Sequence, residues 1–145
     1  MNTIIEKVNF LQKVELFADF PTEQLSYLAA IAEIESYEKG EAMFAIGDRS
    51  DLLFMVISGK VEMHRNGKVM RVFGKNAAVG VLGFFDREPR LFDAVCQNPC
   101  DLLVIAADDF FDLLEDKVHI TVHLLRYFVT QLRELYTEYH PEKLE

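Results

Sequence analysis

The stretch SYEKGEAMFAIGDRSDLLFMVISGKVEMHRNGKVMRVFG, residues 36–74, decides the fold, because short apolar runs alternate in it with glycine turns. Gly40 and Gly47-Asp48 enclose a brief apolar run. Residues 51–59 (DLLFMVISG) are apolar on both alternating faces, which predicts a strand covered on both sides. Asn66-Gly67 suits a tight turn with two positive φ angles, so residues 60–74 are predicted to form a hairpin. Many short strands with glycine turns favour a barrel or a jelly roll.

Helical patterns lie on either side of this strand region. Residues 3–14 (TIIEKVNFLQKV) carry apolar side chains at helical spacing, and Pro21 to Glu23 indicate the start of a second helix. Residues 100–110 (CDLLVIAADDF) predict another buried strand, and Asp108-Asp109 can cap the helix that follows. We therefore expect a mainly β, single-domain chain with an N-terminal helical lead in 1–35, a jelly-roll β-sandwich in 36–107 and C-terminal helices in 108–140.

The last helix, expected over about residues 117–139, carries apolar residues at heptad spacing. One line consists of Val118, Leu125, Leu132 and Tyr139, with Phe128 and Leu135 in the complementary seam positions. Val122, Val129 and Tyr136 form a second apolar line at the same interval. The pattern predicts a homodimer through this helix. The competing interpretation is a helix folded wholly back on its own barrel.

Composition narrows the function classes. The chain has 145 residues and a net charge of −9, and its 15 Lys and Arg are scattered, so no basic stripe for nucleic acid is present. It ends just after the long helix, so we expect no helix-turn-helix domain and no nucleic-acid partner. No stretch reaches the length of a membrane span and no signal peptide opens the chain, so we expect a cytoplasmic protein without a membrane partner.

Residues 8–135 resemble the cyclic nucleotide-binding domain family, as in bacterial catabolite-activator-type regulators and the regulatory subunits of protein kinase A. The likeness rests on the helical lead, Gly40-Glu41, Gly47-Asp48 and the strand ending at Ser58-Gly59. It implies a jelly roll of about eight strands with flanking helices, and a long C-terminal helix that mediates dimerisation or closes over the ligand. It also implies a regulatory, ligand-sensing module that is not an enzyme and acts on an output partner that the sequence does not identify.

The loop of residues 79–95 (VGVLGFFDREPRLFDAV) is similar to the phosphate-binding cassette of that family. In the family the cassette reads Gly-Glu-Leu-Ala-Leu-Leu and later Pro-Arg-Ser/Thr-Ala, where the glutamate accepts from the ribose 2′-hydroxyl and the arginine and backbone N–H groups hold the phosphate. The candidate ligand-binding positions in this chain are Gly80, Val81, Leu82, Gly83, Phe84, Arg90, Leu91 and Phe92.

Three of these positions depart from the family pattern. Val81 stands at the glutamate position, Leu91 at the Ser/Thr position, and Phe92 where a small residue is usual. We therefore expect little affinity for cyclic AMP or cyclic GMP, although Arg90 can still attract a small anion. The alternative is a genuine cyclic-nucleotide sensor that uses altered contacts.

Other candidates have plainer interpretations. Arg90 is as well placed for an ion pair with Glu88 or Asp86 as for a ligand. Cys96 and Cys100 suit buried hydrophobes better than a redox pair. A zinc site at Glu115, His119 and His123, or a haem at His64, is less expected than exposed side chains, so we predict no metal site. No nucleophile, base and orienting group stand at a recognisable spacing, which favours a non-enzymatic chain.

Overall fold

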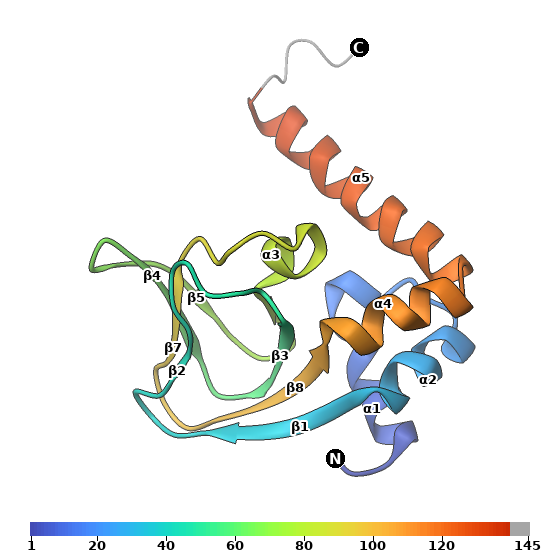
Figure 1. Cartoon of the computed structure of the whole chain (residues 1–145), viewed down its shortest axis with the longest axis horizontal. Coiled ribbons are helices and arrows are strands. Elements are labelled where there is room, and N and C mark those ends of the chain that lie inside the picture. Colours follow the sequence, from blue (N-terminus) through green and yellow to red (C-terminus); the bar gives the residue numbers. More distant parts are fainter. Residues whose placement is uncertain (140–145) are drawn as a thin grey trace.

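Two antiparallel four-stranded sheets form the centre of the chain (Figure 1), in a computed structural model that describes residues 1–139. One sheet has the strand order β1-β8-β3-β6 and the other β2-β7-β4-β5. The strands are β1 (Ala32–Tyr37), β2 (Ala42–Phe44), β3 (Leu52–Ser58), β4 (Val61–Arg65), β5 (Lys68–Phe73), β6 (Ala78–Val79), β7 (Asp93–Cys96) and β8 (Cys100–Ala106). The chain passes repeatedly from one sheet to the other, which confirms the predicted mainly β jelly roll with flanking helices.

The predicted local features of the strand region are present. Leu53 to Val56 of β3 are all buried, so this strand is covered on both faces. Asn66 and Gly67 have φ angles of 54° and 74°, and they connect β4 to β5 as the Asn-Gly pair predicts. β1 begins at Ala32, before the strand region expected at residue 36, because its pairing with β8 runs from Ala32 opposite Ile105 to Tyr37 opposite Cys100.

The helices lie at both ends of the chain and in the cassette: α1 (Ile4–Leu11), the 3-10 turn η1 (Glu15–Phe17), α2 (Thr22–Ala30), α3 (Val81–Asp86), α4 (Ala107–Asp116) and α5 (His119–Tyr139). The prediction that Asp108-Asp109 caps a helix was wrong. Ala106 occupies the N-cap position without a side-chain bond, and both aspartates lie in the first turn of α4. Their charge there still favours the helix, because it faces the positive end of the helix dipole.

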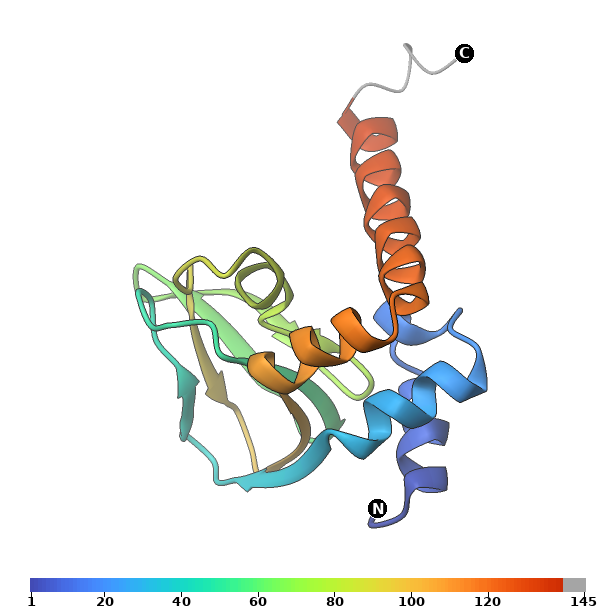
Figure 2. The ribbon, with the colours of Figure 1, turned by 45° about the vertical axis from the view of Figure 1, so that its right-hand side comes forward.

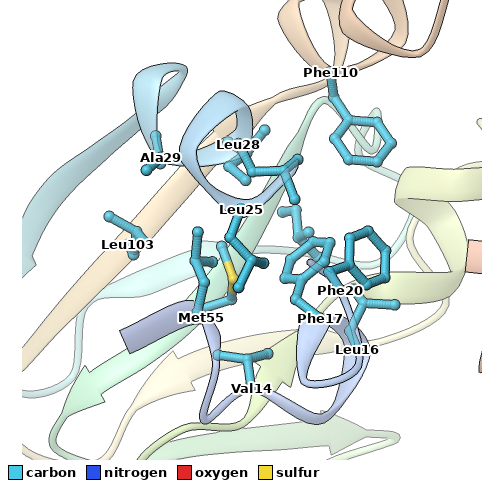
Figure 3. Close-up of a cluster of buried hydrophobic side chains, with 14 of the residues drawn as sticks. Val14, Leu16, Phe17, Phe20, Leu25, Leu28, Ala29, Met55, Leu103 and Phe110 are labelled. Carbon is cyan, nitrogen blue, oxygen red and sulfur yellow. The ribbon is translucent and has the colours of Figure 1, made fainter. Parts of the chain in front are cut away.

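Two hydrophobic clusters hold these layers together. The first joins the helices to one face of the β1-β8-β3 sheet, and Figure 3 shows Leu25, Leu28 and Phe110 of the helices in one cluster with Met55 and Leu103 of the sheet. The second fills the space between the two sheets and includes Phe44, Phe54, Val61 and Leu102. Phe84 of α3 and Leu124 of α5 belong to the first cluster, so the cassette and the last helix share one core.

α5 leaves this core after its first turns and extends away from the sheets, as both views of the ribbon show (Figures 1 and 2). Only Ile120 and Leu124 are buried in it. Val118, which was predicted to be part of this helix, lies in a turn before it, because α4 ends at Asp116 and Thr121 N donates to the Val118 carbonyl. Within residues 1–139, no helix is long and apolar enough to cross a membrane. Residue 140 of the predicted C-terminal range lies outside the described residues.

Candidate functional site

The cassette forms a short helix, α3, in the connection between β6 and β7. Gly80 precedes it in the left-handed conformation, with a φ of 81°. A Cβ at Gly80 would overlap Nη1 of Arg90, and a Cβ at Gly83 would overlap Oγ of Ser50. Gly80 and Gly83 therefore leave room where a side chain would clash. In the structure they let the arginine and Ser50 pack directly against the cassette backbone.

Arg90 is the buried cation of the site, with 5% of its surface exposed. Its Nη1 donates to the Gly80 carbonyl at 2.8 Å and its Nη2 donates to the Leu52 carbonyl. The guanidinium lies over the Phe44 ring at 4.1 Å from the centroid. Burial lowers the pKa of Arg90, and the charges of Asp51 and Asp48 oppose that shift. The group stays protonated because an arginine is not deprotonated in proteins.

The sequence also allowed an ion pair of Arg90 with Glu88 or Asp86, and this alternative was wrong. Within residues 1–139, Arg90 forms no ion pair. Asp86 accepts instead from the Glu88 N–H at 2.9 Å, and the Glu88 carbonyl accepts from the Ser50 hydroxyl at 2.6 Å. The Arg90 backbone is held by the turn at Gly47-Asp48, with Arg90 N donating to Asp48 O and Gly47 N donating to Arg90 O, both at 2.9 Å. The turn glycine at position 47 therefore positions the arginine of the site.

A cavity of about 680 Å³ adjoins the cassette. Its other walls come from the segment after α1, from β4, β5 and the turn before β6, and from α5. The cassette residues that line it are Gly80, Val81, Leu82, Gly83, Arg90, Leu91 and Phe92. The structure thus brings together all the predicted ligand-binding positions except Phe84. That side chain is fully buried, and its ring packs against Phe110 and Phe111 at centroid distances of 5.1 Å and 5.9 Å. Phe84 is a core residue and does not belong to the site.

Sequence reasoning missed the polar residues on the other walls of the cavity. Lys13 comes from the segment after α1, Arg71 from β5, and Lys75 and Asn76 from the turn before β6. None of them stands in a local pattern that points to a ligand. The strand alternation of the predicted hairpin was the only sequence signal for this wall, because every second side chain of a strand points to the same face. That signal does not distinguish Arg71 from the other residues of the hairpin.

α5 supplies the last wall of the cavity through Tyr127, Phe128, Gln131 and Leu135. Phe128 packs edge-on against Phe85 of α3, with 5.0 Å between centroids. It therefore lies on the inner face of the helix rather than in a seam directed at a partner.

Burial raises the pKa of Tyr127, and the charges of Glu15 and Glu134 add to the effect. Glu15 itself accepts from the Gln131 amide at 3.3 Å.

The opposite face of α5 is exposed and apolar. Without Val118, which precedes α5, the two predicted apolar lines combine into one seam with alternating steps of three and four residues, consisting of Val122, Leu125, Val129, Leu132, Tyr136 and Tyr139. Each of these side chains is between 44% and 69% exposed. This spacing is that of the a and d positions of a coiled coil.

The remaining candidates resolve into structural roles. Glu115 lies in the last turn of α4 while His119 begins α5, so the three candidate zinc ligands do not share one helix face. The His123 ring packs against Phe20, with 5.2 Å between centroids. Nε2 of His64 lies 3.0 Å from a Glu62 carboxylate oxygen. Among residues 1–139, no three His, Cys, Asp or Glu side chains cluster as metal ligands would.

Cys96 and Cys100 are both buried, one in β7 and the other in β8, and both thiols are free. Burial raises the pKa of the Cys96 thiol to about 12, with a further contribution from its contact with Cys100. A thiol that stays protonated near neutral pH is a poor nucleophile. The interpretation as two buried hydrophobes therefore fits the structure.

Comparisons with known proteins agree with this architecture. The family model for the cyclic nucleotide-binding domain matches residues 34–117. The solved N-terminal domain of a transcriptional regulator from Streptomyces coelicolor has a TM-score of 0.79 and 28% identity, covering 89% of this chain and 93% of that one. A CRP-like cAMP-activated global transcriptional regulator from Mycobacterium tuberculosis is 25% identical over 138 residues, covering 92% of this chain and 59% of the relative.

A cGMP-dependent protein kinase from Caenorhabditis briggsae is 23% identical over 116 residues, covering 75% of this chain and 16% of the kinase. The chain spans less than two thirds of the length of both curated relatives. The expectation that no nucleic acid is a partner finds no support here, because two of the similar proteins are named as transcriptional regulators. The matched family model covers more than half of the chain and coincides with the two sheets and the cassette, so the chain belongs to the cyclic nucleotide-binding domain family.

Proposed function

We propose that this chain is a non-enzymatic regulatory module of the cyclic nucleotide-binding domain family whose ligand site has diverged. In this proposal the site has little affinity for cyclic AMP or cyclic GMP and responds to another small anion. The module dimerises through α5 and passes its state to an output partner. The alternative function is a cyclic-nucleotide sensor with altered contacts, which the names of the cAMP-activated and cGMP-dependent relatives favour.

One observation carries the proposal: the cavity keeps the buried cation Arg90 but has Val81 at the position of the family's ribose acceptor. Val81 is half-buried and packs against the helical core. A ribose hydroxyl placed beside it would lose its bonds to water and gain no acceptor from that side chain. The Ser/Thr position is likewise occupied by Leu91, which offers no donor.

The loss of binding free energy for a cyclic nucleotide is large enough that the site no longer selects this ligand. Each of the two missing hydrogen bonds involves a charged group, the glutamate carboxylate or the phosphate, and contributes about 1.5–3 kcal/mol. Without both, affinity falls by about two to four decades. The buried ribose hydroxyl adds a desolvation cost to this loss. Affinity for an ordinary cyclic nucleotide is then too weak to serve a regulatory switch.

The dimer part of the proposal rests on the exposed seam of α5. A coiled-coil spacing that faces solvent over most of a 21-residue helix exposes more apolar surface than a single chain needs. A second copy of the same seam is complementary to it, because a and d residues of one helix fit between those of the other. The inner residues Ile120, Leu124 and Phe128 remain in contact with their own chain.

Calorimetric titration with cyclic AMP and cyclic GMP tests the ligand proposal directly. We expect no saturable heat for either nucleotide up to high micromolar concentrations. A dissociation constant in the low micromolar range or tighter would refute the divergence of the site and establish the alternative.

A further inference from the structure

The walls of the cavity differ from the rest of the molecule in charge. The chain carries a net charge of −9, yet the cavity is lined by Lys13, Arg71, Lys75 and Arg90 against a single carboxylate, Glu15. Glu15 already accepts from Gln131 at 3.3 Å. Within the described part of the chain, none of the four cations forms an ion pair. A concave surface with uncompensated cations concentrates anions, because field lines are focused in a cleft with low-dielectric walls.

Arg90 has a polar atom that the protein itself leaves without a partner. Its Nη1 and Nη2 atoms donate to two backbone carbonyls, whereas Nε is buried and has no hydrogen-bond partner in the structure. Because only 5% of the Arg90 surface is exposed, bulk water solvates the guanidinium weakly and screens its charge poorly. An anion beside Arg90 supplies a direct charged partner, whereas Asp48 and Asp51 act on the guanidinium without forming an ion pair with it.

The cassette side of the cavity is apolar where a nucleotide needs polar partners. Val81, Leu82, Leu91 and Phe92 line the cassette side, and Phe73 lies on the sheet side. Leu82 and Leu91 are 61% and 53% exposed, so apolar surface at the cavity remains open to water. A ligand with an apolar body covers this surface, and removing it from water favours binding.

The cavity size suits a molecule of two or three rings. Its volume of about 680 Å³ lies in the range of sites that enclose a small organic molecule. Aromatic side chains of α5, Tyr127 and Phe128, border the same space and can pack against a flat body.

From these features we propose that the cavity binds an organic anion with an apolar, aromatic body, with the charged group toward Arg90 and the body between Phe92 and α5. This inference rests on the proposed function, because it requires a site that no longer selects for ribose. It adds the ligand class: an aryl sulfonate or carboxylate rather than a nucleotide.

The probe for the test is 8-anilinonaphthalene-1-sulfonate, and its matched control is N-phenyl-1-naphthylamine, which has the same aromatic body without the sulfonate. Fluorescence titration of the full chain measures both. We expect one site per chain and at least tenfold tighter binding of the sulfonate than of the neutral amine. Equal affinity of the two compounds, or no binding of the sulfonate, overturns the proposal.

Variants locate the bound probe. Arg71→Gln with Lys75→Gln removes two exposed cations of the cavity without disturbing the core, so folding is preserved, and we expect roughly tenfold weaker sulfonate binding from the loss of two nearby charges. The matched control, Lys39→Gln with Arg65→Gln, removes two exposed cations elsewhere and should leave binding unchanged. Equal weakening by both pairs overturns the proposal. So does loss of binding in Leu132→Glu, which lies on the exposed seam of α5.

Cyclic AMP separates the two levels of inference. Low-micromolar affinity for cyclic AMP refutes the proposed function whatever the sulfonate does. Failure of both cyclic AMP and the sulfonate to bind leaves the diverged site intact and overturns only the ligand class.

Discussion

Restoring the family side chains at three cassette positions should restore cyclic-nucleotide binding. The triple variant is Val81→Glu, Leu91→Ser and Phe92→Ala. All three side chains line the cavity, and Leu91 is more than half exposed, so the new groups face the ligand space without rebuilding the core. Arg90 already lies at the same wall, held by two carbonyls and by the turn at Gly47-Asp48.

The expected gain follows from two new hydrogen bonds to charged groups. The glutamate accepts from the ribose hydroxyl and the serine donates to the phosphate, each contributing about 1.5–3 kcal/mol. Together they correspond to about two to four decades in affinity. Val81 packs partly against the helical core, and placing a carboxylate there reduces the gain. We therefore expect cyclic AMP to bind the triple variant about two decades more tightly than the parent.

Isothermal titration calorimetry of parent and variant measures the gain, with circular dichroism to show that both are folded. A matched control keeps Leu91→Ser and Phe92→Ala but carries Leu82→Glu instead, which places the same charge one residue along α3. The control should gain less than tenfold. A folded triple variant with no gain over this control refutes the reasoning, and it would mean that Arg90 is committed to the Gly80 and Leu52 carbonyls.

Three further predictions concern the rest of the molecule. Leu125→Glu with Leu132→Glu should convert a homodimer into a folded monomer, because charges replace apolar seam residues; light scattering checks this, and a monomeric parent at tens of micromolar would contradict the dimer. Gly80→Ala should lower the free energy of unfolding by about 1–3 kcal/mol in urea denaturation, since a Cβ there meets both a left-handed backbone and the Arg90 guanidinium. Gly67→Ala, with a similar φ and open space around it, should cost only about 1 kcal/mol, and equal losses would rule out the contact with the arginine. With its pKa raised to about 12 by burial, Cys96 should resist thiol reagents at pH 8 in the folded chain and react once urea unfolds it.

Local sterics account for the features that the sequence predicted well. The Asn-Gly turn, the doubly covered strand β3 and the helices α1 and α2 each depend on residues within about ten positions of one another. The cassette was also located from its own residues, because its glycines and Pro89-Arg90 stand close together. The side chain of its Phe84 belongs to the core, which the family position alone did not decide, since an apolar side chain there can face either a ligand or the core.

The last helix shows a different limit. The alternation of four and three residues identified the seam on α5, but the sequence did not show which apolar residues its own chain would cover. Phe128 turned inward because Phe85 of α3 lies beside it. The start of the last helix was expected at about Lys117, and the structure has the break between α4 and α5 there, with α5 beginning two residues later at His119.

The sequence by itself determined the family, the strand and turn pattern, and the presence of Val81 where the family pattern has a glutamate, because each of these depends on residues that are close together in the chain. Only the tertiary structure decided that Arg90 bonds to the Gly80 and Leu52 carbonyls rather than to Glu88, and that Lys13, Arg71 and Lys75 border the same cavity. These residues are far apart in the chain, and pairing between the strands of two sheets brings them together. The physical reason is that side-chain partners across a packed sandwich depend on register and layer, which local spacing does not specify.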